Sequence, residues 1–215
     1  MSAERPHALI TGGATRNPVD AIRYMSAHAT GATAVAIAMA LGGSHRLRLL
    51  GSAEANLRAA LADPSIPTTE YTSTRDLMAK MEEELRGNPG GVLVHSAAVG
   101  DYEANAAATK VPSGQPELML RLTPTPKIVD RVREWSPDVF LVSFKAGNPE
   151  WDEERLEAVA RAQLTRTRSD LVFANRLGAL STSCLLVSAS TTTRFEHRGD
   201  AVRQLAERIK GTRPR

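Results

Sequence analysis

The stretch that decides the fold of this chain is His7-Ala-Leu-Ile-Thr-Gly-Gly-Ala-Thr-Arg-Asn-Pro-Val-Asp-Ala-Ile-Arg-Tyr-Met-Ser-Ala-His-Ala-Thr-Gly31. It places an apolar run over residues 7–11 before a glycine turn, followed by the small-residue start of a helix near Thr30. Open α/β proteins use this order to hold a phosphorylated nucleotide, because the helix N-terminus faces the negative charge. The stretch therefore predicts an α/β fold with its ligand site beside this turn.

Length and composition place further bounds on the protein. The 215 residues, 42% of them hydrophobic, are enough to bury one substantial core and predict a single domain over residues 1–215. The first five residues are polar, and no later apolar run approaches the roughly 18–20 residues that a membrane helix needs. We therefore expect a soluble, cytoplasmic protein that does not bind membranes.

Charge and cysteine content exclude several classes of protein. The net charge is +3, but its basic residues are scattered among acids and aromatics make up only 4% of the chain, which disfavours a nucleic-acid platform. Cys184 is the only cysteine, so neither an intrachain disulfide nor a cysteine-built zinc site is possible, and no metal-binding side chains are predicted. Its apolar neighbours indicate a buried core thiol rather than a reactive nucleophile.

Strands and helices alternate along the chain, which predicts a mainly parallel sheet covered on both faces. Strands are expected at residues 7–11, 47–50, 68–71, 92–94, 139–144, 171–174 and 184–188, the last pairing antiparallel with the stretch up to 196. Helices are expected at 30–41, 54–62, 73–86, 126–135, 152–165 and 201–210. A turn at 110–114 and the alternating residues 117–122 predict a β-ribbon projecting from the sheet. The fold class is therefore a three-layer α/β fold with a projecting ribbon.

Four predicted strand ends carry small or polar residues directly after an apolar run. They are residues 11–13, 95–102, 143–145 and 174–175. Ligands bind at the carboxyl ends of parallel strands, and small residues let them approach the backbone. A simple turn explains any one of these segments, Gly12 and Gly13 included, but four together favour a ligand site.

The same segments resemble, in order and over nearly the whole chain, the phosphopantothenoylcysteine synthetase (phosphopantothenate–cysteine ligase) family. The first motif is similar at Ile10-Thr11-Gly12-Gly13, Pro18, Val19, Asp20, Arg23 and Thr30-Gly31. The later similarities are Ser96-Ala97-Ala98-Val99-Gly100-Asp101-Tyr102 to Ala-Ala-Ala-Val-x-Asp-Tyr/Phe, Lys110 to the first lysine of Lys-Ile-x-Ser, and residues 172–175 to Val-x-Ala-Asn. Ser143-Phe144-Lys145 looks closer to the stand-alone and eukaryotic-type enzymes than to the domain fused behind a flavoprotein decarboxylase.

The resemblance implies a Rossmann-like, homodimeric ligase that uses Mg²⁺. ATP or CTP would activate the carboxylate of 4′-phosphopantothenate, or of a related phosphorylated acid, as an acyl-nucleotidylate, and the amine of cysteine would displace the nucleotide. The implied phosphate-binding residues are Gly12, Gly13, Thr30 and Gly31. The implied base- and ribose-binding residues are Ala97, Ala98, Asp101, Phe144 and Asn175. Lys110 on the ribbon is the implied catalytic residue, which would close over the substrate and neutralise phosphate charge.

Each polar candidate also has an alternative interpretation. Lys110 is equally consistent with a solvated lysine on a mobile loop. Asp101 is consistent with a cap on the following turn, and Asn175 with a turn residue.

The chain departs from the family pattern inside the expected site. The family's Asn-x-Ser-Ser-Gly is Ala27-His28-Ala29-Thr30-Gly31 here, and an alanine side chain cannot hydrogen-bond an oxyanion. Losing one such donor typically costs ~10² to 10³ in rate. His28 is either a substitute donor or a surface histidine. Further departures are Ala34 in place of glycine, Pro112 in the lysine loop, and Ala146-Gly147-Asn148 after Lys145.

Three functions remain open at this point. The first is an active ligase of this family's kind, and the second is a divergent homologue that binds nucleotide and dimerises without ligating. The third is an NAD(P)-dependent oxidoreductase, suggested by Thr11-Gly12-Gly13. Enzymes of that class have a third spaced glycine and a Tyr-x-x-x-Lys pair. None of Tyr24, Tyr71 and Tyr102 is followed by a lysine four residues later.

Overall fold

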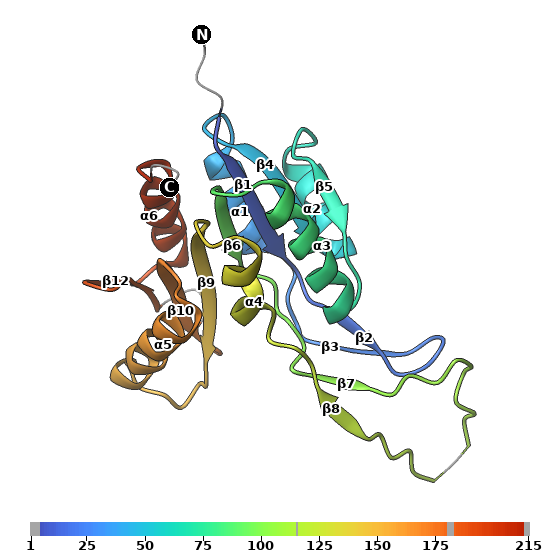
Figure 1. The fold of residues 1–215 in the computed structure, drawn as a ribbon. Coiled ribbons are helices and arrows are strands. Elements are labelled where there is room, and N and C mark those ends of the chain that lie inside the picture. The colour runs from blue at the N-terminus through green and yellow to red at the C-terminus, as the bar shows by residue number, and fades with distance from the viewer. Residues whose placement is uncertain (1–4, 115, 180–182, 213–215) are drawn as a thin grey trace.

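An eight-stranded sheet lies between two layers of helices in the computed structural model, which describes residues 5–114, 116–179 and 183–212 (Figure 1). The sheet strands are β1 (His7–Gly12), β4 (Arg46–Gly51), β5 (Thr68–Glu70), β6 (Val92–His95), β9 (Phe140–Gly147), β10 (Leu171–Arg176), β11 (Cys184–Val187) and β12 (Thr192–Phe195). The helices are α1 (Ala32–Leu41), α2 (Ala53–Ala62), α3 (Thr74–Gly87), α4 (Ile128–Trp135), α5 (Glu153–Thr167) and α6 (Arg198–Lys210). The predicted three-layer α/β fold is confirmed.

The order of strands in the sheet is β12-β11-β10-β9-β6-β1-β4-β5. All neighbours from β10 to β5 pair in parallel. β12 pairs antiparallel with β11, as predicted, and β11 also pairs antiparallel with β10, which was not predicted. After β1 the chain winds outward to β4 and β5, then crosses back to β6 and winds the other way to β9 and β10. The winding therefore reverses between β1 and β6, and it is at such a switch point that open sheets leave a crevice for ligands.

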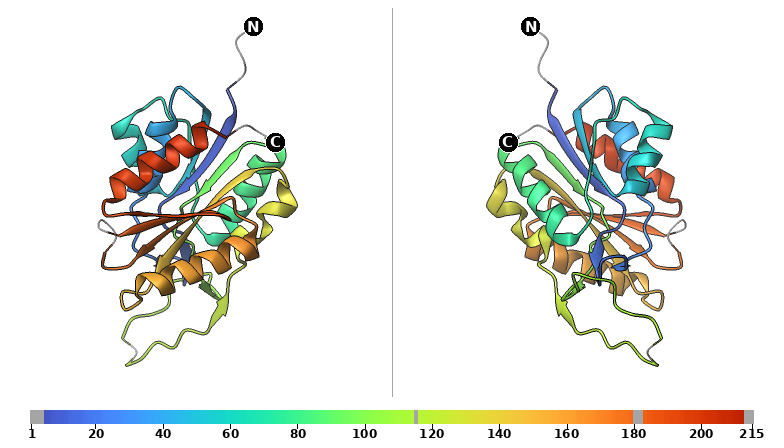
Figure 2. Two further views of the ribbon diagram at one scale, coloured as in Figure 1. Left: turned by 90° about the vertical axis from the view of Figure 1, so that its left-hand side faces the viewer. Right: turned by 90° about the vertical axis from the view of Figure 1, so that its right-hand side faces the viewer.

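The core forms because successive strand residues face opposite sides of the sheet. In β1, Ala8 and Ile10 pack under α1, whereas Leu9 packs under α3 and α4. Figure 2 shows α1, α2 and α6 over one face and α3, α4 and α5 over the other. Among the residues described, no helix is both long and apolar enough to cross a bilayer.

Helix starts follow local side-chain chemistry. Ser73, predicted to cap α3, accepts a hydrogen bond from the backbone N–H of Asp76 at 3.2 Å, and Asp152 caps α5 in the same way. α1 ends at Gly42, as its glycine pair predicts. α6 begins at Arg198, three residues earlier than expected.

Two short antiparallel pairs lie outside the main sheet. β2 (Arg16–Pro18) pairs with β3 (Tyr24–Ser26), forming a hairpin that the sequence did not predict. β7 (Tyr102–Ala104) pairs with β8 (Leu122–Pro124), which confirms the projecting ribbon. The expectation of a strand over 117–122 was wrong, because β7 spans three residues and offers partners only to 122–124. The described residues 105–114 and 116–121 form the loop of this ribbon, which extends away from the sheet (Figure 1).

Candidate functional site

A cavity of about 460 Å³ opens at the carboxyl ends of β6, β9 and β10, and we call it the main cavity. Its walls come from the strand ends, the N-terminal turn of α4, α5, the first residue of α6 and the segment before α1. Five of the ten predicted site residues line it: Ala97, Ala98, Asp101, Phe144 and Asn175. The structure thus brings together the residues that were predicted to hold a base and ribose.

A second cavity, of about 300 Å³, lies beside the first. It is lined by Thr30 and by Arg16, Tyr24, Ala27, Ser52 and other residues of the β2–β3 hairpin and the starts of α1 and α2. His28 and Ala29 line both cavities. The segment in which the chain departs from the family pattern is therefore the partition between them.

Gly12, Gly13 and Gly31 line neither of these cavities. They lie where α1 and α2 pack most closely on the end of β1. Gly31 has φ +78 as the N-cap of α1, and a Cβ there would collide with Ala55; a Cβ on Gly13, at φ +88, would collide with the Ser52 hydroxyl. Close packing accounts for these glycines, and their contact with a ligand stays a prediction.

Lys110 is exposed on the ribbon loop and also lines neither cavity. The next residue is held firmly: the Val111 N–H donates to Asp20 Oδ2 at 3.0 Å, and the Arg23 guanidinium donates to the Val111 carbonyl. Hydrogen bonds from the backbone N–H groups of Ile22, Val111 and Arg23 lower the pKa of Asp20 to about 2. A permanently charged carboxylate therefore anchors the ribbon directly beside Lys110.

Asn175 carries the clearest sign of a ligand. It lies inside β10, so it is not a turn residue, and it is only 5% exposed. Its side-chain amide lines the main cavity and makes no hydrogen bond to any described residue. Its polar atoms are not among the fully buried ones that lack a partner, so they face the cavity, where a ligand or water can hydrogen-bond with them.

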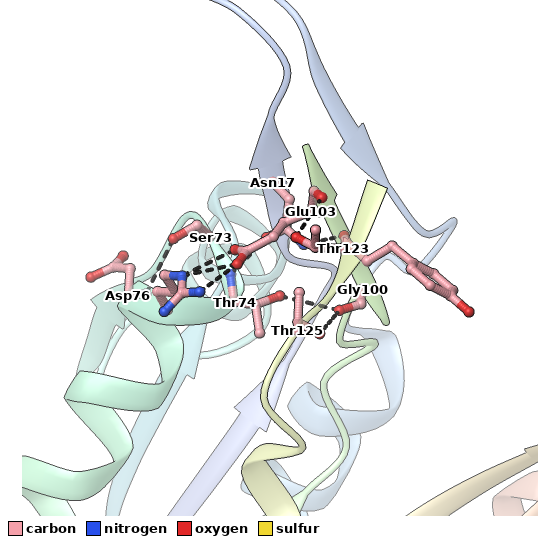
Figure 3. A network of polar contacts seen from close by, with 10 residues as sticks. Asn17, Ser73, Thr74, Asp76, Gly100, Glu103, Thr123 and Thr125 are labelled. Carbon is pink, nitrogen blue, oxygen red and sulfur yellow. Dashed lines mark hydrogen bonds and ion pairs between the residues drawn. The ribbon is translucent and has the colours of Figure 1, made fainter. Parts of the chain in front are cut away.

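Asp101 is exposed and forms an ion pair with Lys127, the N-cap residue of α4. The segment that carries it is fixed by the polar network shown in Figure 3. The Gly100 carbonyl accepts hydrogen bonds from Thr125 Oγ1 at 2.6 Å and from Thr74 Oγ1, while Asn17 bridges the Thr74 N–H and the Tyr102 carbonyl, both at 2.9 Å. These hydrogen bonds connect α3, the β2–β3 hairpin and the β7–β8 ribbon to the end of the 95–102 segment, which forms part of the cavity wall.

An aromatic stack forms another wall. The Phe144 and Phe173 rings stack with centroids 4.8 Å apart, and the Arg198 guanidinium lies 5.1 Å from the centroid of Phe173. Gln163 Nε2 donates to the Phe144 carbonyl at 3.1 Å, which fixes the strand below. Phe144 and Arg198 both line the main cavity, so a flat ring can rest there beside a cation.

Basic residues outnumber acidic ones in the lining of the main cavity, although Lys127 pairs with Asp101 and Arg166 with Asp130. Four cationic side chains line it, namely Lys127, Lys145, Arg166 and Arg198, against the single carboxylate of Asp101. None of these four was predicted as a site residue. No sequence pattern pointed to Arg198, because it is the first residue of α6 and its position at the site depends on the antiparallel strands β11 and β12 that precede it.

His95 is a further residue of the cavity that sequence reasoning did not assign. It ends β6, is 7% exposed and lines the main cavity. Its Nδ1 lies 2.8 Å from Thr11 Oγ1, and burial lowers its pKa to about 4, so the imidazole is neutral at pH 7. The signal was present, since His95 is a polar residue that closes a buried apolar run, as Asn175 does.

Within the described ranges, no group of three or more His, Cys, Asp or Glu residues is arranged to hold a metal ion. A magnesium ion that entered this site would rely chiefly on substrate phosphates, as Mg²⁺ commonly does.

The fold and site together define an α/β protein with a cationic small-ligand cavity at the switch point of its sheet. Residues 3–210 match the family described as the DNA/pantothenate metabolism flavoprotein C-terminal domain. The chain belongs to this family, and the predicted resemblance to the phosphopantothenoylcysteine synthetase type is confirmed.

Known relatives agree with this assignment. The chain is 38% identical over 214 residues to the coenzyme A biosynthesis bifunctional protein CoaBC of Thermococcus kodakarensis, covering 97% of this chain and 51% of that protein. The protein of the same name from Escherichia coli is 29% identical over 178 residues, with 78% and 40% covered. The chain thus spans about half or less of these relatives. The crystal structure of the DNA/pantothenate metabolism flavoprotein from Streptococcus pneumoniae superimposes with a TM-score of 0.82 at 26% identity, covering 95% of this chain and 98% of that one.

Proposed function

We propose that this chain is a nucleotide-dependent ligase that joins 4′-phosphopantothenate, or a related phosphorylated carboxylate, to cysteine. The observation that carries the proposal is the Asn175 amide, which makes no hydrogen bond to the described residues and lines one cavity with Phe144 and four cationic residues at the switch point of the sheet. Such a cavity suits a base next to a polyphosphate. Relatives named for coenzyme A biosynthesis support the choice of substrates.

The main cavity would hold ATP or CTP. The side chains in the cavity do not distinguish between the adenine and cytosine bases. Phe144 and Asn175 would contact the base, and the backbone at Ala97 and Ala98 would lie close because neither side chain is large. Asp101 would contact the ribose, and Lys127, Lys145 and Arg166 would lie toward the phosphates. Mg²⁺ bound with the triphosphate would offset phosphate charge.

The second cavity would hold the phosphorylated acid. Arg16 is cationic and stacks on Tyr24, with its guanidinium carbon 4.9 Å from the ring centroid, and Thr30 lies at the start of α1. A carboxylate oxygen of the acid would attack the α-phosphorus and pyrophosphate would leave with the electron pair of the broken bond. The amine of cysteine would then attack the acyl carbon, releasing the nucleoside monophosphate.

Lys110 would act in a homodimer, which is the assembly that we propose. Exposed apolar side chains gather on the β2–β3 hairpin and the ribbon: Ile22, Tyr24, Tyr102, Leu118, Met119, Leu120 and Leu122. Apolar patches of this kind mark protein interfaces. Lys110 lines neither cavity of its own chain, and the same ribbon would bring it to a partner.

One observation favours the second candidate, a protein that binds nucleotide without ligating. Ala27, which replaces the family's asparagine, lines the second cavity at the partition, so a donor is missing where the two substrates would meet. The oxidoreductase alternative is disfavoured by membership of this family.

Pyrophosphate release separates the two candidates. The assay mixes the full chain with Mg²⁺, phosphopantothenate, cysteine and either ATP or CTP. Release with one nucleotide supports the ligase, whereas calorimetric binding of nucleotide without release supports the second candidate. In the same titration, Asn175→Ala should weaken nucleotide binding about tenfold, because it removes a hydrogen-bonding amide. Asn88→Ala, at the far end of α3, is the control and should bind as the unaltered protein does.

A further inference from the structure

We propose that His95 is a functional group of the main cavity, donating a hydrogen bond from Nε2 to an α-phosphoryl oxygen of the bound nucleotide. This inference rests on the proposed function and adds a residue to its site. The residue was not among the side chains predicted to bind nucleotide.

The place of His95 in the sheet is the first argument. As the last residue of β6, it pairs in register with Thr11 of β1 on one side and Ser143 of β9 on the other. It therefore stands at the switch point, with the second cavity beyond β1. Phe144 and Asn175 lie on β9 and β10 on the α1–α6 side of the sheet, as Val142 and Phe173 two residues earlier do, whereas His95 faces the α3–α4 side with Leu93. All three residues line the main cavity, so a nucleotide lying across the strand ends would place its base on β9 and β10 and its α-phosphate at β6.

The hydrogen bonds around His95 favour one tautomer of its ring. Thr11 Oγ1 accepts a hydrogen bond from the Ala97 N–H at 3.2 Å, and it has one proton of its own to donate. Among the described residues, the acceptor within reach of that proton is His95 Nδ1, at 2.8 Å. A neutral imidazole that accepts at Nδ1 carries its proton on Nε2. The structure therefore presents an N–H donor on the remaining ring nitrogen.

That donor has no partner in the described part of the chain, although His95 is nine-tenths buried and lines the main cavity. Nε2 is not among the fully buried polar atoms that lack a partner, so it is open to the cavity, where a ligand oxygen would accept its hydrogen bond. Burial also lowers the pKa of His95 to about 4, so the ring stays uncharged at working pH. It would donate without giving up its proton: the acid forms a bond to the α-phosphorus, the bond to pyrophosphate breaks, and the Nε2 proton remains on His95.

Two substitutions separate the two ring nitrogens. In H95Q the amide reaches the position of Nε2 and keeps a donor in the cavity, whereas in H95N it reaches only the position of Nδ1, near Thr11. We expect H95N to lower kcat for pyrophosphate release by about 10²-fold, the effect typical of losing one such donor, with KM for the nucleotide changed less. H95Q should recover most of that loss. Thr11→Val should also lower kcat, because it removes the hydroxyl that hydrogen-bonds Nδ1 and holds the ring in one tautomer. Thr11→Ser keeps this hydroxyl and is its control.

A readout without turnover comes from nitrogen NMR of the histidine-labelled, unaltered protein. The spectrum should show His95 protonated at Nε2. Adding ATP or CTP with Mg²⁺ should shift the Nε2–H signal, whereas adding the matching nucleoside, which lacks phosphates, should leave it nearly unmoved.

The outcomes distinguish this inference from the proposed function. Protonation at Nδ1, or an Nε2–H signal that a bound nucleotide does not move, together with H95N turnover equal to that of the unaltered protein, overturns the role of His95 while ligation stands. A protein that binds neither nucleotide overturns the proposed function and this inference with it. Because the NMR experiment uses the unaltered chain, a variant that does not fold leaves the test intact.

Discussion

The stability of the folded protein at acidic pH depends on single titratable residues, and the buried imidazole of His95 contributes strongly. Its pKa is about 4 in the folded protein, against 6.5 for an ordinary histidine, because burial disfavours the charged ring. The unfolded chain therefore takes up a proton first. The stability that this group provides is complete above pH 6.5 and is lost as the pH falls from 6.5 to about 4. The difference corresponds to roughly 3 kcal/mol.

Urea unfolding at pH 7 and at pH 4.5 checks this expectation. From pH 7 to pH 4.5, the free energy of unfolding should decrease less in H95Q than in the unaltered protein. His7 and His45, whose pKa values burial also lowers, are present in both and serve as the common background. Equal falls in the two proteins would contradict the assignment.

Residue by residue, the site was only partly predictable from the sequence. Asn175 was found because it follows an apolar run and matches a family motif, and it lines the main cavity without a side-chain hydrogen bond to the described residues. His95 gave the first of these signals without the second. Lys145 lies in the strand end 143–145 and in a family-like segment but was not assigned to the site. Arg198 gave neither signal, because a cation at the start of a helix looks the same whether or not it borders a cavity.

Between elements, one buried ion pair ties α4 to the sheet. Arg133 Nη2 donates to Asp170 Oδ2 at 2.9 Å, and the guanidinium also donates to the carbonyls of Arg168, Pro137 and Val139. The Asp170 carboxylate accepts from the Leu141 N–H at 2.8 Å, which joins β9 to the start of β10. Both side chains are largely buried.

We expect Arg133→Leu to lower the free energy of unfolding by about 3–5 kcal/mol, because it leaves a buried carboxylate without its cation. Urea denaturation measures the loss. The double variant Arg133→Leu with Asp170→Leu should recover part of it, since an apolar pair needs no compensating charge. Arg131→Leu, in the exposed pair with Glu134, is the control and should change stability by less than about 1 kcal/mol. A small loss in Arg133→Leu would show that this pair does not hold α4.

The ribbon depends on a different contact, between Asp20 and the backbone of Val111. Asp20→Ala removes the acceptor and should raise hydrogen exchange at the Val111 amide by roughly tenfold, with the core strands unchanged. Arg75→Ala breaks the ion pair with Glu103 at the base of the ribbon and should leave the Val111 amide protected. Equal exchange in Asp20→Ala and the unaltered protein would show that the ribbon is held elsewhere.

The β2–β3 hairpin shows why some elements escaped sequence reasoning. Each strand has three residues, too few for an alternating pattern to be recognised. Its turn is set by Asp20, whose Oδ1 accepts from the N–H groups of Ile22 and Arg23. The ribbon was located through its turn and alternation, but its second strand was misplaced because the partner β7 is as short as β2.

For the whole molecule, the layered fold was predictable because long-range order follows from a repeated local pattern. Each strand that alternates with a helix must pair in parallel and bury both faces, so the strand ends had to converge on one edge. The partition at His28 was not predictable, because it depends on how the segment after the hairpin runs along both cavities.

Assembly is the property of the whole molecule that is most directly testable. Leu118, Met119 and Leu120 are exposed on the ribbon, Met119 at 85%, and β7 lies against the β2–β3 hairpin, which carries Ile22 and Tyr24. Exposed apolar groups on one projecting arm suit contact with the same arm of a second copy, since a two-fold interface uses the same patch twice. The protein should therefore sediment as a dimer.

Replacing Leu118 and Met119 together by glutamate should yield a monomer in sedimentation velocity, because the interface would bury four charges. The control replaces Leu57 and Leu61 by glutamate; these are equally exposed leucines on α2, away from the ribbon, and the dimer should persist. If the proposed role of Lys110 in a partner's site is right, the monomer should also lose pyrophosphate release while its Asn175 cavity still binds nucleotide. A monomeric unaltered protein, or a ribbon variant that remains dimeric, would place the interface elsewhere and leave Lys110 as a solvated lysine.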